Sequence, residues 1–134
     1  MNLLIISLTL IVIVLFLYAM KSRKEKVNSR FLSRTDFPFD ELYEKYFSED
    51  FPDKVLTKEL LEHVAGSLNI SVGVLRPEDS FKKELKEEKG WEFDSSIQML
   101  FIEIEKLAKE KDIDLMGKQI NTLKDYLQTM VLIY

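Results

Sequence analysis

The feature that most constrains this chain is an uncharged run near its N-terminus. Residues 3–20 read LLIISLTLIVIVLFLYAM and contain no charged side chain. As an α-helix, this run would rise about 27 Å, which is close to the hydrocarbon thickness of a bilayer. A buried helix of a globular domain would carry polar residues along one side, and this run offers only Ser7, Thr9 and Tyr18. The run predicts a transmembrane helix over residues 1–20, with the membrane as its partner through residues 3–20.

Positive charges follow the apolar run and do not precede it. Lys21, Arg23, Lys24 and Lys26 stand directly after it. The positive-inside rule therefore predicts a single-pass protein of the cell's inner or plasma membrane, with its N-terminus outside and its soluble part in the cytoplasm. The same four residues can contact anionic lipid headgroups. The alternative is a cleavable signal peptide, but the basic leader and small-residue cleavage site typical of one are missing.

Charge separates along the rest of the chain. Residues 21–34 carry six Lys/Arg and one Glu, whereas residues 36–134 carry 13 Lys/Arg and 22 Asp/Glu, a net charge of −9. Residues 21–35 lack an apolar period and are predicted to form a basic juxtamembrane linker. A nucleic-acid-binding protein gathers basic residues on its folded part. The acidic remainder of this chain therefore argues against nucleic acid as a partner.

Apolar periodicity beyond the linker predicts helices and no strand, so the fold class is all-α. Residues 36–52 form a short aromatic-rich helix in this interpretation, opened by Pro38 and Asp40 and closed before Pro52. Residues 53–134 form a small helical domain. Its first helix is capped by Asp53 or Thr57 and runs to Leu68, and its last is capped by Asn121 or Thr122. The loop between the first two helices carries apolar residues that can fill the core: Ile70, Val72, Val74 and Leu75.

The central helix of this domain is predicted to start at Asp94 or Ser95 and to end near Lys111. Its apolar residues recur at helical spacing and form one stripe: Ile97, Leu100, Phe101, Ile104, Leu107 and Ala108. We expect three glutamates to face away from this stripe: Glu103, Glu105 and Glu110. His63 has no cysteine or second histidine with which to share a metal, and we expect it at the surface.

The sequence offers no recognisable catalytic or metal-binding motif. It contains one histidine, no cysteine, no Gly-rich phosphate loop, no zinc-ligand spacing and no nucleophile elbow. Neighbouring carboxylates such as Glu87 and Glu88 belong to a charged run typical of a solvated surface. We therefore expect a protein that is not an enzyme.

Three segments resemble the acyl carrier protein family. LLEHVAGSLNISVGVLRPEDSFKKEL resembles its first helix and long loop, LFIEIEKLAKEKDIDL is similar to its acidic second helix, and INTLKDYLQTM resembles its closing helix. The resemblance covers residues 55–131 approximately and implies a four-helix bundle. In that family a serine at the start of the second helix carries 4'-phosphopantetheine, and acidic residues of this helix meet basic patches on partner enzymes. The resemblance makes Ser95 the candidate cofactor-bearing residue, and Glu103, Glu105 and Glu110 the candidate partner-binding residues.

The chain departs from the family pattern around this helix. The link KKELKEEKGWEF is longer than the family's, and MGKQ is too short for its usual third helix. An apolar residue should follow the attachment serine, but Ser96 follows Ser95. Alignment by the apolar stripe places Ile97 at the attachment position instead. Ser95 with Gln98 also matches a capping box, which requires no cofactor.

These observations favour one function and leave a second open. The first is a membrane-anchored, acyl-carrier-like domain without a phosphopantetheine arm and with no cofactor, acting as a protein-interaction or regulatory module. The alternative is a functional acyl or peptidyl carrier protein with 4'-phosphopantetheine on Ser95.

Overall fold

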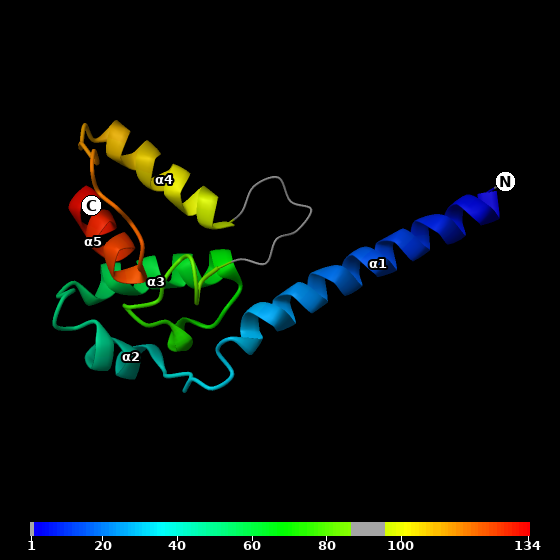
Figure 1. The fold of residues 1–134 in the computed structure, drawn as a ribbon, viewed down its shortest axis with the longest axis horizontal. Helices are drawn as coiled ribbons and strands as arrows, with labels where there is room; N and C mark the ends of the chain where they lie inside the picture. The colour runs from blue at the N-terminus through cyan, green and yellow to red at the C-terminus, as the bar shows by residue number, and fades with distance from the viewer. Residues whose placement is uncertain (1, 87–95) are drawn as a thin grey trace.

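The computed structural model describes residues 2–86 and 96–134, with side chains for all of these except 2–5 and 22–28. The helices are α1 (Asn2–Ser29), α2 (Phe39–Tyr46), α3 (Lys54–Leu68), the short 3-10 helix η1 (Val72–Val74), α4 (Ser96–Glu110) and α5 (Leu123–Ile133). The described ranges contain no strand, only an isolated bridge between Ser80 and Thr122. The all-α prediction is confirmed. In Figure 1, α1 projects as a single rod from the group formed by the other helices.

The predicted N-terminal membrane span is not supported, and this part of the fold prediction is corrected. Among the residues that the structure describes, no helix is both long enough and apolar enough to cross a membrane. Helix α1 is uncharged up to Met20, and its charged part begins at Lys21.

The segment predicted as a linker over residues 21–35 has a different structure. Helix α1 continues through it to Ser29 without a break. The chain then turns, and Phe31 is buried in the hydrophobic core of the helical domain. The end of this segment therefore belongs to the folded domain, because a core side chain fixes it there.

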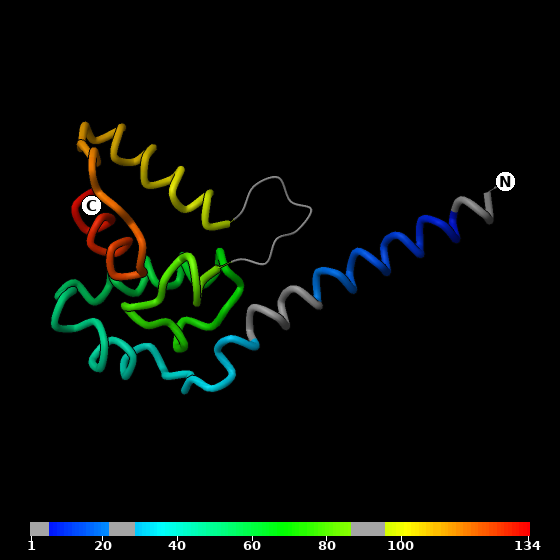
Figure 2. Tube along the Cα trace, in the orientation of Figure 1, coloured from blue at the N-terminus to red at the C-terminus, as the bar shows by residue number. Residues whose placement is uncertain are grey.

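Helices α3, α4 and α5 pack against one another and enclose most of the core, while η1 and α2 lie on the opposite side of α3. Figure 2 shows the connection from α4 running back to the start of α5, which lies beside α3. This connection, residues 111–122, contains turns and no helix. The most deeply buried large side chains come from all the packed elements: Leu42, Phe47, Leu61, Leu75, Leu100, Ile104, Leu123, Tyr126, Leu127 and Met130.

Side-chain caps define where two of these helices begin. Asp53 Oδ1 accepts a hydrogen bond from the Leu56 N–H at 3.0 Å and caps α3. Thr122 caps α5 in a capping box, in which the Asp125 carboxylate accepts a hydrogen bond from the Thr122 N–H. These contacts satisfy backbone donors that have no partner within the helix. Of the alternatives left open by the sequence, Asp53 and Thr122 are the caps.

The loop after α3 is held on the domain by its own backbone. Leu123 N–H donates to the Asp79 carbonyl at 2.8 Å, and Phe81 N–H donates to the Asn121 carbonyl at 3.0 Å. Its predicted side chains fill the core: Val74 and Leu75 are buried, and Ile70 and Val72 are partly buried. Phe81 and Leu85 are buried as well and were not predicted.

The aromatic residues of α2 and its C-cap Phe47 pack against the domain. Tyr43 and Phe47 are buried, and the Tyr43 hydroxyl donates to the Phe51 carbonyl at 2.8 Å. On the same side, the Arg76 guanidinium lies over the rings of Tyr46 and Phe37, at 4.5 and 5.2 Å from their centroids. These rings are packed within the fold and do not form an open aromatic platform.

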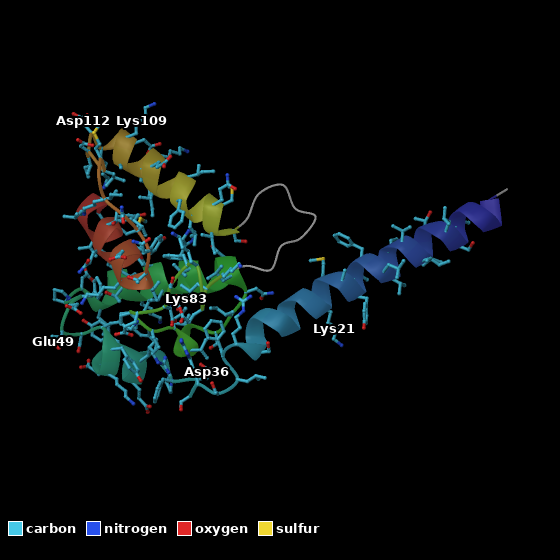
Figure 3. All side chains as sticks on the ribbon, in the orientation of Figure 1. Lys21, Asp36, Glu49, Lys83, Lys109 and Asp112 are labelled. Carbon is cyan, nitrogen blue, oxygen red and sulfur yellow. The ribbon has the colours of Figure 1, made fainter. Side chains whose placement is uncertain are left out.

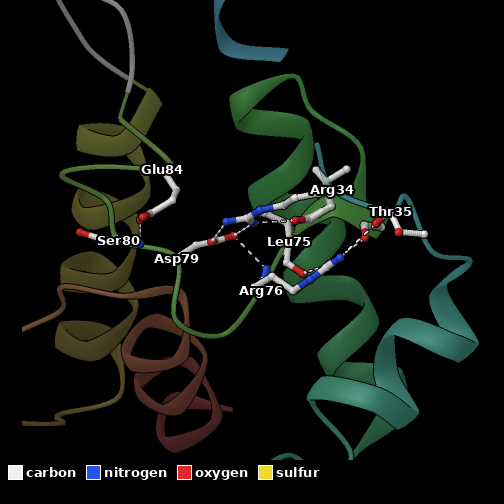
Figure 4. Close-up of polar contacts among 9 residues, drawn as sticks. Arg34, Thr35, Leu75, Arg76, Asp79, Ser80 and Glu84 are labelled. Carbon is white, nitrogen blue, oxygen red and sulfur yellow. Dashed lines mark hydrogen bonds and ion pairs between the residues drawn. The ribbon is translucent and has the colours of Figure 1, made fainter. Parts of the chain in front are cut away.

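A buried ion pair joins the segment after α1 to the long loop. Asp79 is 2% exposed and accepts two hydrogen bonds from the Arg34 guanidinium. Figure 4 shows Arg76 beside this pair, with its backbone N–H donating to Asp79 Oδ2 at 2.8 Å and its side chain reaching the Thr35 carbonyl. Buried charges are tolerated when they are paired and hydrogen-bonded. The carboxylate of Asp79 therefore holds the segment after α1 against the long loop.

Candidate interaction surface on α4

Helix α4 is positioned by the apolar stripe that its sequence predicts. Leu100, Ile104 and Ala108 are buried against α3 and α5. Ile97, Phe101 and Leu107 are partly buried beside them. The Phe101 ring meets the Phe81 ring edge-on at 5.3 Å between centroids, which adds the long loop to the contacts of this helix. The helix therefore has one defined orientation and one free side.

The free side of α4 begins with apolar residues. Met99 and Ile102 are 52% and 46% exposed. They are three residues apart and are neighbours on the helix surface. Lys106 and Lys109 continue the same side toward the end of the helix and are exposed. Figure 3 places Lys109 at the far end of the domain from α1. We call the side formed by Met99, Ile102, Lys106 and Lys109 the outer face of α4.

Glu103 lies at one edge of the outer face and has a partner within the domain. Its carboxylate oxygen is 2.7 Å from Nε2 of His63 on α3, and both side chains are 44% exposed. The prediction that His63 lies at the surface is confirmed, but its role in joining α3 to α4 was not predicted. Because the two positions are 40 residues apart, no local pattern in the sequence indicates this contact.

The three candidate glutamates do not share one face. Glu103 and Glu105 are two residues apart, which is about 200° around a helix. Glu105 consequently lies on the opposite flank, beside the connection that follows α4, whereas Glu103 contacts α3. Glu110 is exposed in the last turn. The carboxylates border the outer face on two sides and do not form the acidic strip that the sequence suggests.

A groove lies along the Glu105 flank of α4. It has a volume of about 260 Å³, and apolar side chains from α4 and from the following connection line it, with one charge of each sign. These residues are Phe101, Ile104, Glu105, Leu115, Lys118 and Ile120. Its volume is below the usual range of small-molecule sites. We therefore treat it as a border of the outer face.

Ser95, the candidate attachment residue, lies outside the described residues, as does its predicted capping role with Gln98. Ile97, which aligns with the attachment position by the apolar stripe, packs against the core. Within the ranges that the structure describes, no group of His, Cys, Asp and Glu side chains could hold a metal ion.

The fold and this surface define an all-helical domain with an exposed helix face. Comparison of the chain with protein-family models, with curated proteins and with solved structures gave no match.

Proposed function

We propose that this chain is a protein-interaction module whose contact surface is the outer face of α4. The observation that carries the proposal is the pair Met99 and Ile102, which stays about half exposed while the other side of the same helix is buried. Apolar side chains at the centre of a contact surface, surrounded by polar groups, are the usual composition of a protein interface. The resemblance to acyl carrier proteins supports the same helix, because the family uses it to meet partners.

The expected partner is a protein with an apolar centre and, at its edge, basic groups that meet Glu105 and Glu110 and acidic groups that meet Lys106 and Lys109. Glu105 and Glu110 border the outer face and are exposed, and the residues from 36 onward carry a net charge of −9. Such a charge distribution favours encounter with a basic surface. Glu103 contributes less to this contact in our proposal, because its carboxylate already pairs with His63.

Site-specific photocrosslinking of the full chain tests the proposal. A photoreactive residue at position 102 should give a discrete adduct with a partner protein, and Met99→Glu in the same chain should abolish it. Position 55 supplies the matched control, because Val55 is an exposed apolar residue on α3. Adducts of the same size from both positions, or none from position 102, would show that the outer face is not the contact surface.

We further propose that the module works without a phosphopantetheine arm. Ile97 occupies the attachment position in the alignment by the apolar stripe and packs against the core. Intact-mass measurement after co-expression with a phosphopantetheinyl transferase tests this point. An unchanged mass is expected. A gain equal to the arm, lost in Ser95→Ala, would establish the carrier function instead.

A further inference from the structure

We infer that lipid covers the apolar surface of α1. The large apolar side chains of this helix between residues 6 and 20 are between 48% and 72% exposed. Soluble proteins rarely leave a contiguous apolar surface of this extent uncovered, and a surface that is left uncovered marks a contact site. The helix projects away from the rest of the fold (Figure 1), so the domain itself does not cover it.

The distribution of these apolar side chains around α1 favours lipid over a protein partner as the covering group. Residues 10–17 are all apolar and all exposed, and they occupy more than two turns of the helix. A helix that pairs with another protein helix carries an apolar stripe and a polar side. The apolar surface of α1 has no such preferred side. A second copy of the chain would cover one side only, whereas lipid chains contact a helix from every direction.

The charges beyond this surface complement an anionic lipid. Lys21 is exposed at the end of the apolar stretch, and Arg23, Lys24 and Lys26 follow it in the sequence. Basic residues next to an apolar segment are attracted to the negative surface potential of anionic headgroups. Covering this surface with lipid does not require α1 to cross a bilayer.

The position of the domain follows from this contact. Phe31 is buried in the core, and Arg34 pairs with Asp79, so the folded domain begins within a few residues of the end of α1. Lipid bound to α1 would therefore hold the helical domain close to the lipid surface.

Vesicle flotation of the full chain tests the inference. The chain should float with phosphatidylcholine vesicles, and more strongly when phosphatidylserine is added. Val12→Glu and Leu15→Glu should each lower the partition coefficient on the order of a hundredfold, since a charge is costly in an apolar lipid phase. Lys21→Gln should weaken binding about fivefold, and only to the anionic vesicles.

Val55→Glu is the matched control, because it places the same charge on an exposed apolar position of α3. It should float like the unaltered chain, and so should the α4 variant Met99→Glu. A chain that stays at the bottom of the gradient would overturn the inference, as would equal flotation of the Val12→Glu variant. Analytical ultracentrifugation without vesicles tests whether a second copy of the chain, and not lipid, covers the apolar surface of α1. A discrete oligomer that Val12→Glu dissociates, together with no flotation, would assign the surface to self-association.

Discussion

Arg34 and Asp79 are 45 residues apart and form a two-pronged ion pair inside the domain. Arg34 Nη1 lies 2.8 Å from Asp79 Oδ2, and Nη2 lies 2.7 Å from Oδ1. The hydrogen bond to Asp79 raises the pKa of the Arg34 guanidinium, although burial acts in the opposite direction. The guanidinium therefore keeps its positive charge. Arg34 also donates to the Val74 carbonyl at 2.9 Å. One side chain thus fastens the segment after α1 to both η1 and the long loop.

Removal of this arginine should destabilise the whole domain. Arg34→Ala leaves the carboxylate of Asp79 buried without its charged partner, and we expect a loss of about 3 kcal/mol in the free energy of unfolding. Arg34→Lys keeps the charge but not the two parallel hydrogen bonds, so its loss should be smaller. Urea unfolding followed by circular dichroism measures both.

Lys54→Ala is the control for this experiment. Lys54 pairs with Asp40 at 2.9 Å on the surface, and an exposed pair of this kind adds little stability. Its unfolding midpoint should stay close to that of the unaltered chain. Equal midpoints for Arg34→Ala and Lys54→Ala would contradict the central role of the buried pair.

Local signals made most of the helical domain predictable. The apolar stripe of α4 and the caps Asp53 and Thr122 depend on residues within one or two helical turns, and the sequence contains these directly. The contacts of Arg34 with Asp79 and of His63 with Glu103 join distant positions, so no periodic pattern indicates them. The lack of charge and the length of the run at residues 3–20 predict a membrane span, which the described residues do not support.

Gly73 should tolerate no side chain. A Cβ at this position would lie 2.0 Å from Asp36 Oδ1 and 2.2 Å from the Phe37 carbonyl oxygen. The backbone of Phe37 also donates to the Gly73 carbonyl at 3.3 Å, so the two segments cannot separate without loss of this bond. We expect Gly73→Ala to lower the free energy of unfolding by about 2 kcal/mol, as measured by urea unfolding.

Gly66 on α3, unlike Gly73, has room for a side chain. A Cβ there would meet nothing within 4 Å, which shows that this glycine does not serve a close packing contact. Gly66→Ala should therefore raise the stability by about 0.5–1 kcal/mol, because alanine favours the helix and restricts the unfolded chain. If both alanine variants shifted the stability in the same direction, steric contact would not explain the effect at Gly73.

The capping box of α5 should make stability depend on pH in the acid range. Burial raises the pKa of Asp125, but hydrogen bonds from the Thr122 and Asn121 N–H groups outweigh it, and the pKa lies below its ordinary value of 3.8. A lowered pKa in the folded state gives stability that is present above pH 3.8 and is lost as the pH falls through the folded value. Asp125→Asn should flatten this loss.

The acid dependence is measured by thermal unfolding at a series of pH values below 5. Asp125→Asn should also cost about 0.5 kcal/mol at neutral pH, because it removes a negative charge from the helix N-terminus. Thr122→Ala should cost about 1 kcal/mol through loss of the cap itself. Glu59→Gln, an exposed position on α3, should leave the acid profile unchanged. A profile that Asp125→Asn does not alter would assign the acid loss to other carboxylates, such as Glu84, whose pKa is lowered by hydrogen bonds from the Ser80 and Glu84 N–H groups.

The contact between His63 and Glu103 should stabilise the attachment of α4 without serving its outer face. Both side chains are about half exposed, so a double-mutant cycle of His63→Ala and Glu103→Ala should give a coupling energy of about 0.5 kcal/mol. Because Glu103 lies at the edge next to α3, Glu103→Ala should also leave the photocrosslink from position 102 intact, whereas Glu105→Lys with Glu110→Lys should weaken it. A crosslink that disappears in Glu103→Ala, with an unchanged unfolding midpoint, would instead place this carboxylate in the partner contact.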